Sequence, residues 1–253
     1  MSTGSASAAS PLARVATLLH GVVAYVAFLG TFLFAIGFVS GVTPVTVHGG
    51  RASELVPALL VNGGILALFA LQHTVMARLA FKRVWTRVVP PAIERSTFVL
   101  ATCAILATLF WQWRALPGVF WELAGPAAWL VRAVAACGWL IVLVGSFQID
   151  HFALFGLAQT VRYFRASEIP PARFEERGFY RHVRHPLMLG FLVAFWATPV
   201  MSGGHLFFAA MCTGYILVGT HIEERTLIAE HGDAYRAYLR RVPAFFPRFR
   251  RAG

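Results

Sequence analysis

The chain has 253 residues, of which 58% are hydrophobic and only 13% are charged, whereas a soluble domain carries roughly 25% charged residues. This balance excludes an ordinary soluble domain and is typical of a protein embedded in a membrane. The formal net charge of +11 does not indicate nucleic acid, because the basic residues lie beside apolar runs, where topology and anionic headgroups explain them. We therefore expect membrane lipid as a partner and no nucleic acid.

The first part of the chain predicts a tail followed by four membrane helices. Residues 1–14 are rich in Ser, Ala and Gly, so we expect a flexible tail there. A helix needs about 20 mainly apolar residues to cross the hydrocarbon core of a bilayer. Four uncharged runs within residues 15–149 approach this length and predict transmembrane helices at 15–40, 55–77, 96–113 and 133–149.

A fifth apolar run, residues 187–222, is uncharged from end to end and is too long for one crossing. Pro199 and the pair Gly203-Gly204 interrupt this run. Because proline and glycine break helices, we predict a hairpin of two helices, the first of them short. The basic intervals 78–95 and 162–184 and the basic tail should then share the cytoplasmic side with both termini.

After the hairpin, Leu227, Tyr235 and Tyr238 are spaced as in an amphipathic helix, and Pro243 would stop it. We expect this helix to lie along the membrane surface. The predicted fold class is therefore all-α: a polytopic transmembrane bundle of five to six apolar helices, followed by a C-terminal amphipathic helix on the cytoplasmic side. No second soluble domain is visible.

Polar residues inside membrane segments are costly, so each is a functional candidate. Gln72 and His73 lie in the second run, as substrate contacts or as a hydrogen-bonded pair that joins helices. Asp150 and His151 follow the fourth run, and a carboxylate beside an imidazole can provide a base. Adjacent helical residues point about 100° apart, however, so a polar collar at the helix end is an equal alternative.

The densest polar cluster is the segment 178–186, Gly-Phe-Tyr-Arg-His-Val-Arg-His-Pro. Pro186 biases His185 away from the helical region, so we expect an extended chain whose backbone groups are free to bind a ligand. Its aromatic, imidazole and guanidinium groups suit an adenosyl group and a carboxylate. The hairpin would return Glu223 and Glu224 to this segment, as salt-bridge partners or as acceptors for ribose hydroxyls or an ammonium group.

The order Arg184-His185-Pro186, apolar hairpin, Glu223-Glu224 and tail tyrosines and prolines resembles the isoprenylcysteine carboxyl methyltransferase and phospholipid methyltransferase superfamily. The resemblance implies that S-adenosylmethionine binds between the His-Pro segment and the paired glutamates. The cofactor-binding residues would be Tyr180, His182, Val183, Arg184, His185, Pro186, Leu189, Gly190, Glu223 and Glu224. The carboxyl methyltransferases have a tyrosine two places after the proline, where this chain has Met188.

Three further stretches, residues 71–78, 90–97 and 150–157, are similar to the bacterial methanethiol S-methyltransferases. This similarity implies one membrane methyltransferase domain over residues 15–253, in a bacterial inner membrane, with the cofactor region at 150–253. The reaction would move the methyl group of S-adenosylmethionine onto the sulfur of methanethiol, without a metal, giving dimethyl sulfide and S-adenosylhomocysteine. The catalytic candidates are His151, Asp150 and Tyr180, and the substrate-binding candidates are Gln72, His73 and Met188.

Three alternatives stay open at this point. The acceptor could be another small thiol or a lipid. The chain could be an accessory membrane protein of the NnrU-like type, without methyltransferase activity. It could also hold haem, because five histidines lie in or near apolar runs: His20, His73, His151, His205 and His221. The oligomeric state is not predicted.

Overall fold

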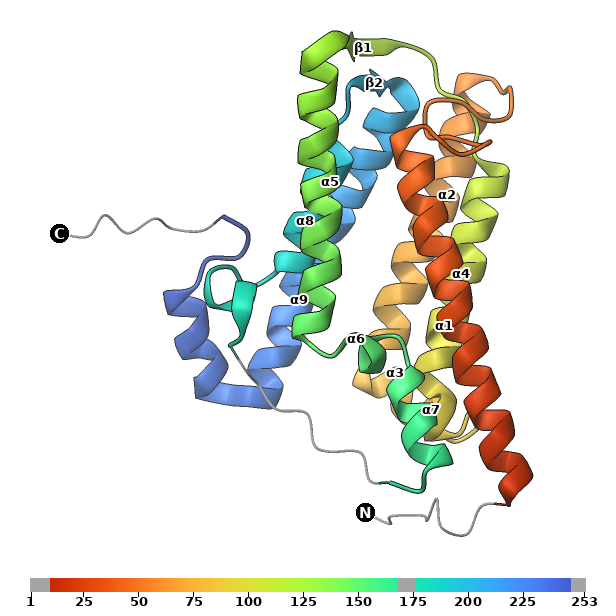
Figure 1. The fold of residues 1–253 in the computed structure, drawn as a ribbon, viewed down its shortest axis with the longest axis vertical. Coiled ribbons are helices and arrows are strands. Elements are labelled where there is room, and N and C mark those ends of the chain that lie inside the picture. Colours follow the sequence, from red (N-terminus) through yellow and green to blue (C-terminus); the bar gives the residue numbers. More distant parts are fainter. Residues whose placement is uncertain (1–9, 168–175, 247–253) are drawn as a thin grey trace, which may run out of the picture.

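The computed structural model describes residues 10–167 and 176–246 (Figure 1). Within these residues, five helices are long and apolar enough to cross a membrane: α1 (Pro11–Ser40), α2 (Leu55–Ala77), α4 (Pro91–Gln112), α5 (Gly125–Gln148) and α9 (Gly203–Arg241). Helix α8 (Pro186–Trp196) is apolar but shorter. These helices confirm the predicted all-α transmembrane bundle, and the chain is an integral membrane protein.

Short elements join the long helices at the two ends of the bundle. The end that carries α3 (Leu79–Trp85), α6 (His151–Leu154) and α7 (Leu157–Phe164) is called the lower end here, and the opposite end is called the far end (Figure 1). A 3-10 helix (Gly178–Arg181) precedes α8. At the far end β1 (Val119–Glu122) pairs antiparallel with β2 (Val200–Ser202), with Val119 opposite Ser202 and Glu122 opposite Val200.

Several helices begin earlier than the apolar runs predicted. Helix α1 begins at Pro11, where the Ser10 side chain accepts a hydrogen bond from the Ala13 amide at 3.2 Å, so residues 11–14 of the predicted tail are helical. Residues 1–9 of that tail lie outside the described residues. Helices α4 and α5 likewise begin before the apolar runs 96–113 and 133–149. The charged residues that delimited the runs are compatible with the first turns of a helix, so they marked the apolar limit and not the helix start.

The predicted hairpin is present, and its first helix is short, as expected. Helix α8 has 11 residues and is therefore about 16 Å long, roughly half of the hydrocarbon thickness. Small residues bring α8 against α5: a Cβ atom added to Gly190 would lie 2.7 Å from the Gly138 carbonyl oxygen. Such close backbone approach is how glycine stabilises helix pairs in membranes.

The C-terminal end of α9 differs from the prediction. Gly232 has a φ of 56° and a ψ of −128°, so the helix breaks there and its last turns fold back beside the segment before α8 (Figure 1). Tyr235 and Tyr238 are buried and cluster with Leu239 of the folded-back turns and with Leu227 of the turns before Gly232. The apolar face of this helix is therefore covered by protein, and its position relative to the membrane surface stays a prediction. The helix does end at Arg241, just before Pro243, as predicted.

Candidate active site

The hairpin brings Arg184 and His185 beside the glutamates of α9. The Arg184 Nε atom donates to Glu224 Oε1 at 2.8 Å, and the His185 Nε2 atom lies 2.9 Å from the same oxygen. The His185 Nδ1 atom lies 3.6 Å from Glu223 Oε2. Arg184, His185, Glu223 and Glu224 are called the Arg-His-Glu cluster below, and their meeting confirms the spatial relationship that the hairpin predicted.

The two glutamates of the cluster are in different environments. The Glu224 side chain is 20% exposed and binds both Arg184 and His185, whereas the Glu223 side chain is 51% exposed. His185 between them is 5% exposed. The Glu224 carboxylate therefore holds the fold of the cluster, and the Glu223 carboxylate is accessible to a ligand.

The backbone of the His-Pro segment is not free, contrary to the sequence-based expectation. The Arg184 amide donates to the Pro243 carbonyl at 2.9 Å, and the His185 amide donates to the Ala244 carbonyl at 3.1 Å. The Arg184 guanidinium also donates to the Leu239 and Val242 carbonyls. His185 lies outside the helical region, as predicted, but the expected extended chain is wrong for Gly178–Arg181, which form a 3-10 helix. The Arg184 and His185 amides bind the chain after α9, which reaches this position because of the reversal at Gly232.

Tyr180 and His182 lie in the turn that precedes the cluster. The Tyr180 carbonyl accepts a hydrogen bond from the Tyr238 hydroxyl at 2.6 Å, which attaches this turn to the last turns of α9. Burial raises the pKa of the Tyr180 phenol, and the charge of Glu223 raises it further. A protonated phenol donates hydrogen bonds, so Tyr180 is suited to binding and not to proton removal. His182 follows the turn and is exposed.

His151 is buried and both of its ring nitrogens have hydroxyl partners. Its Nδ1 atom lies 2.8 Å from Ser146 Oγ, and its Nε2 atom lies 2.9 Å from the Tyr25 hydroxyl. The Ser146 hydroxyl donates to the Leu143 carbonyl, so it accepts from His151 Nδ1, and Nε2 accepts from Tyr25. Burial lowers the pKa of His151, although the charge of Asp150 opposes this shift. The imidazole is therefore neutral at pH 7.

Asp150 does not bind His151. Its carboxylate accepts a hydrogen bond from the Ala153 amide at 3.1 Å and caps the short helix α6. The Asp150 backbone has a φ of 84°, a left-handed conformation that Asp tolerates better than most residues. The structure therefore gives Asp150 a role in turning the chain between α5 and α6.

His73 lies inside the bundle among aromatic rings. Its ring centroid is 5.3 Å from that of Phe69, 4.9 Å from that of Phe98 and 6.3 Å from that of Tyr215. Its Nδ1 atom is buried and has no hydrogen-bond partner within residues 10–167 and 176–246. An unpaired buried polar atom costs about 1–3 kcal/mol, so this nitrogen is a candidate for binding a ligand.

The neighbouring candidates have packing roles. Gln72 of α2 accepts a hydrogen bond from the Thr102 hydroxyl of α4 at 3.2 Å, which agrees with the helix-joining alternative. Gly190 faces Gly138 of α5, and Val183 and Pro186 are buried. Leu189 and Met188 are half-buried in the first turn of α8.

Comparison with known proteins gives close relatives over almost the whole chain. The chain is 52% identical over 237 residues to methanethiol S-methyltransferase 2 of Bradyrhizobium diazoefficiens, covering 93% of this chain and 92% of that protein. It is 48% identical over 236 residues to the methanethiol S-methyltransferase of Mycobacterium tuberculosis, covering 92% and 97%. It is 43% identical over 238 residues to the enzyme of that name from Crocosphaera subtropica, covering 93% of each. The chain belongs to the methanethiol S-methyltransferase family. No protein-family model and no solved structure matches it.

In this member of the methanethiol S-methyltransferase family, two tyrosines reach the candidate site that the sequence did not single out. Tyr25 of α1 binds His151, and Tyr215 of α9 packs against His73. Each is a tyrosine within an otherwise apolar run, and a hydroxyl at membrane depth was the signal that could have found it.

The alternatives to a methyltransferase gain no support from this structure. His205 lies at the far end and binds the Phe195 carbonyl, whereas His20 binds Thr97 and His151 binds Tyr25 near the lower end. These histidines do not converge on a common haem position. The accessory-protein alternative is not favoured, because the close relatives are named as transferases.

Proposed function

We propose that the chain is an S-adenosylmethionine-dependent enzyme that methylates the sulfur of methanethiol and releases dimethyl sulfide and S-adenosylhomocysteine. The observation that carries this proposal is the set of six relatives with the name methanethiol S-methyltransferase, 40% to 52% identical over at least 92% of the chain. Another small thiol or a lipid as acceptor is the competing possibility that the experiment below distinguishes.

We place the cofactor at the Arg-His-Glu cluster. S-adenosylmethionine carries ribose hydroxyls, an ammonium and a carboxylate, and when bound it supplies the methyl group. The exposed carboxylate of Glu223 fits the hydroxyls or the ammonium, and Tyr180 and His182 offer a phenol and an imidazole in the turn just before the cluster. Arg184 and Glu224 neutralise one another at 2.8 Å, so their role is to hold Glu223 and His185 in position.

We place the acceptor thiol toward His73 and Tyr215. Tyr215 precedes Glu223 by eight positions on α9, or roughly 12 Å of helix, so the aromatic surroundings of His73 and the Arg-His-Glu cluster share this helix. A thiol attacks as its thiolate. The unpaired Nδ1 atom of His73 is available to accept the thiol proton in the tautomer that is protonated on Nε2. His151 is a second candidate base, but it would first have to release the Tyr25 hydroxyl.

The apolar surroundings of this acceptor region favour the transfer in two ways. Aromatic rings around His73 exclude water from the acceptor region. The same rings hold a small apolar thiol in orientation toward the cofactor. We propose that the lower end and both termini face the cytoplasm. The basic loop 78–90 and the segment before α8 lie at this end, as expected for cytoplasmic loops.

The test uses purified full-length protein, methanethiol and S-adenosylmethionine labelled in its methyl group. Labelled dimethyl sulfide in the headspace is the expected product. If label appears only in a lipid extract, the acceptor is a lipid. If label is transferred only to longer thiols, the acceptor is another thiol and not methanethiol. Binding of S-adenosylhomocysteine, measured by titration calorimetry, should weaken about tenfold in Glu223→Gln because one charged hydrogen-bond acceptor is lost. The control variant Glu230→Gln changes an exposed glutamate of the same helix and should bind normally; equal binding by both variants would move the cofactor away from Glu223.

A further inference from the structure

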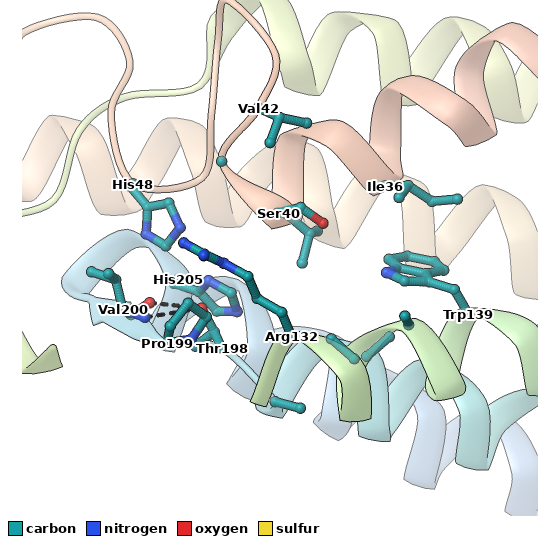
Figure 2. Close-up of a pocket in the computed structure, with 16 residues that line it drawn as sticks. Ile36, Ser40, Val42, His48, Arg132, Trp139, Thr198, Pro199, Val200 and His205 are labelled. Atoms are coloured by element: carbon teal, nitrogen blue, oxygen red, sulfur yellow. Dashed lines mark hydrogen bonds between the residues drawn. The ribbon is translucent and has the colours of Figure 1, made fainter. Parts of the chain in front are cut away.

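A cavity at the far end of the bundle is separate from the candidate active site. It has a volume of about 410 Å³ and lies between the last turns of α1 and the first turns of α5, with the connection from α8 to α9 beside it (Figure 2). Arg132 at its mouth precedes Gln148 by sixteen positions on α5, or roughly 24 Å of helix. Gln148 binds the Phe179 amide beside the Arg-His-Glu cluster. This cavity is called the far-end pocket below.

The far-end pocket carries a permanent positive charge that no carboxylate neutralises in the described part of the chain. Arg132 extends from α5 toward His48 (Figure 2), and its guanidinium lies 5.1 Å from the ring centroid of Trp129. The residues that line the pocket include no Asp or Glu. The lining therefore offers this guanidinium no carboxylate partner within the described residues, so the pocket is complementary to an anionic group.

His205 gives the pocket a second polar feature that points to a ligand. It is fully buried, and its Nε2 atom lies 2.7 Å from the Phe195 carbonyl, to which only a protonated Nε2 can donate. Its Nδ1 atom is therefore an acceptor, and it is buried without a hydrogen-bond partner among the residues that the structure describes. Burial lowers the pKa of the neighbouring His48, so this imidazole is neutral as well. The two imidazoles suit hydroxyl groups, and the charge of Arg132 suits an anion.

Part of the pocket wall is apolar. Ile36 of α1 faces Trp139 of α5 across it (Figure 2), and Val39 of α1 also lines it. Below the pocket, the Trp139 ring contacts the Phe32 ring edge-on, with 5.7 Å between centroids, and this contact closes the way toward the lower end. The outer surfaces of α1 and α5 are lined with exposed residues such as Leu33 and Leu140, which suit lipid chains.

We propose that the far-end pocket binds an anionic phospholipid with a hydroxyl-bearing headgroup, of the phosphatidylglycerol class. Arg132 pairs with the phosphate, as guanidinium groups do, and a headgroup hydroxyl donates to His205 Nδ1. The acyl chains leave between α1 and α5 along their apolar outer surfaces. The volume of the pocket is in the range of small-ligand sites and accommodates the headgroup with the beginning of its chains. This proposal does not depend on the reaction proposed above.

The test is native mass spectrometry of the detergent-purified protein titrated with defined lipids. Phosphatidylglycerol should remain bound about tenfold more tightly than phosphatidylcholine, and Arg132→Gln should remove this preference. Arg51→Gln is the matched control, because Arg51 also lies at the far end over a tryptophan ring but outside the pocket. Phosphatidylmethanol, which has the same charge without the hydroxyls, should bind more weakly than phosphatidylglycerol.

A second pair of variants tests the cavity itself. Ala135→Phe fills the pocket and should displace the lipid, whereas Ala133→Phe on the exposed surface of the same helix should not. An unchanged melting temperature in detergent shows that each variant is folded. Equal retention of phosphatidylcholine, or a preference that survives both Arg132→Gln and Ala135→Phe, would overturn the proposal. Glycerol phosphate that binds as tightly as the lipid would overturn the assignment to a membrane lipid.

Discussion

His185 and Glu224 face each other across the hairpin at 2.9 Å, although 39 positions separate them in the chain. Since Arg184 binds the same carboxylate oxygen, one glutamate positions both residues before Pro186. The adjacent glutamate, Glu223, is left accessible. The two carboxylates should therefore respond differently to the same substitution.

Glu224→Gln should destabilise the protein, whereas Glu223→Gln should weaken cofactor binding with little effect on stability. The first change leaves the half-buried Arg184 without its charged partner and should cost about 2 kcal/mol. Thermal unfolding of both variants in detergent, with binding of S-adenosylhomocysteine measured in parallel, checks the division. The same melting temperature for the two variants would contradict separate roles.

Gly190→Ala should lower the melting temperature, because its Cβ atom would lie 2.7 Å from the Gly138 carbonyl oxygen and force α8 away from α5. The control is Gly214→Ala on α9, where no atom lies within 4 Å of the added Cβ. That variant should be neutral or more stable by up to about 1 kcal/mol, the usual difference between Gly and Ala in a helix. A loss of cofactor binding by Gly190→Ala at unchanged stability would favour direct contact with the cofactor instead.

The His151 site should make stability depend on pH. Burial lowers the pKa of His151 below its ordinary value of 6.5, so the unfolded chain binds a proton more readily than the folded one as the pH falls. Stability from this group is complete above pH 6.5 and decreases as the pH falls below it. The melting temperature should thus drop less between pH 7.5 and pH 5.5 in His151→Gln, which cannot be protonated, than in the unchanged protein. Equal drops would contradict a buried neutral imidazole.

His73→Phe should reduce kcat by roughly 100-fold if His73 accepts the thiol proton, while binding of S-adenosylhomocysteine stays unchanged. The aromatic replacement preserves packing against Phe98 and Tyr215, so stability should also be retained. His20→Phe is a suitable control, since His20 joins α1 to α4 through Thr97. If His73→Phe keeps full activity and His151→Gln does not, the base is His151.

The apolar runs predicted the transmembrane bundle because the length of an apolar run can be compared directly with the thickness of the hydrocarbon core. The hairpin, and with it the meeting of Arg184 and His185 with Glu224, followed from Pro199 and the paired glycines. The local sequence did not indicate which groups the Arg184 and His185 amides, just before Pro186, would bind. Those partners are the Pro243 and Ala244 carbonyls.

That missed contact depends on Gly232, whose backbone conformation reverses the chain. Composition identifies a glycine but not the direction in which the chain leaves it. The pairing of Tyr25 with His151 was missed for a similar reason, since 126 positions separate the two residues. Contacts of this range depend on how helices are arranged in three dimensions, which residue patterns along one helix do not encode.

The attachment of residues 243 and 244 to the His-Pro segment has a practical consequence for handling this protein. A purification tag or fluorescent fusion joined directly after Phe246 would be separated from Ala244 by only two residues, so it could disturb the Pro243 and Ala244 carbonyls that bind the Arg184 and His185 amides. Truncation before Pro243 would release them altogether. Fusions at the N-terminal side of α1 leave these two hydrogen bonds unaffected.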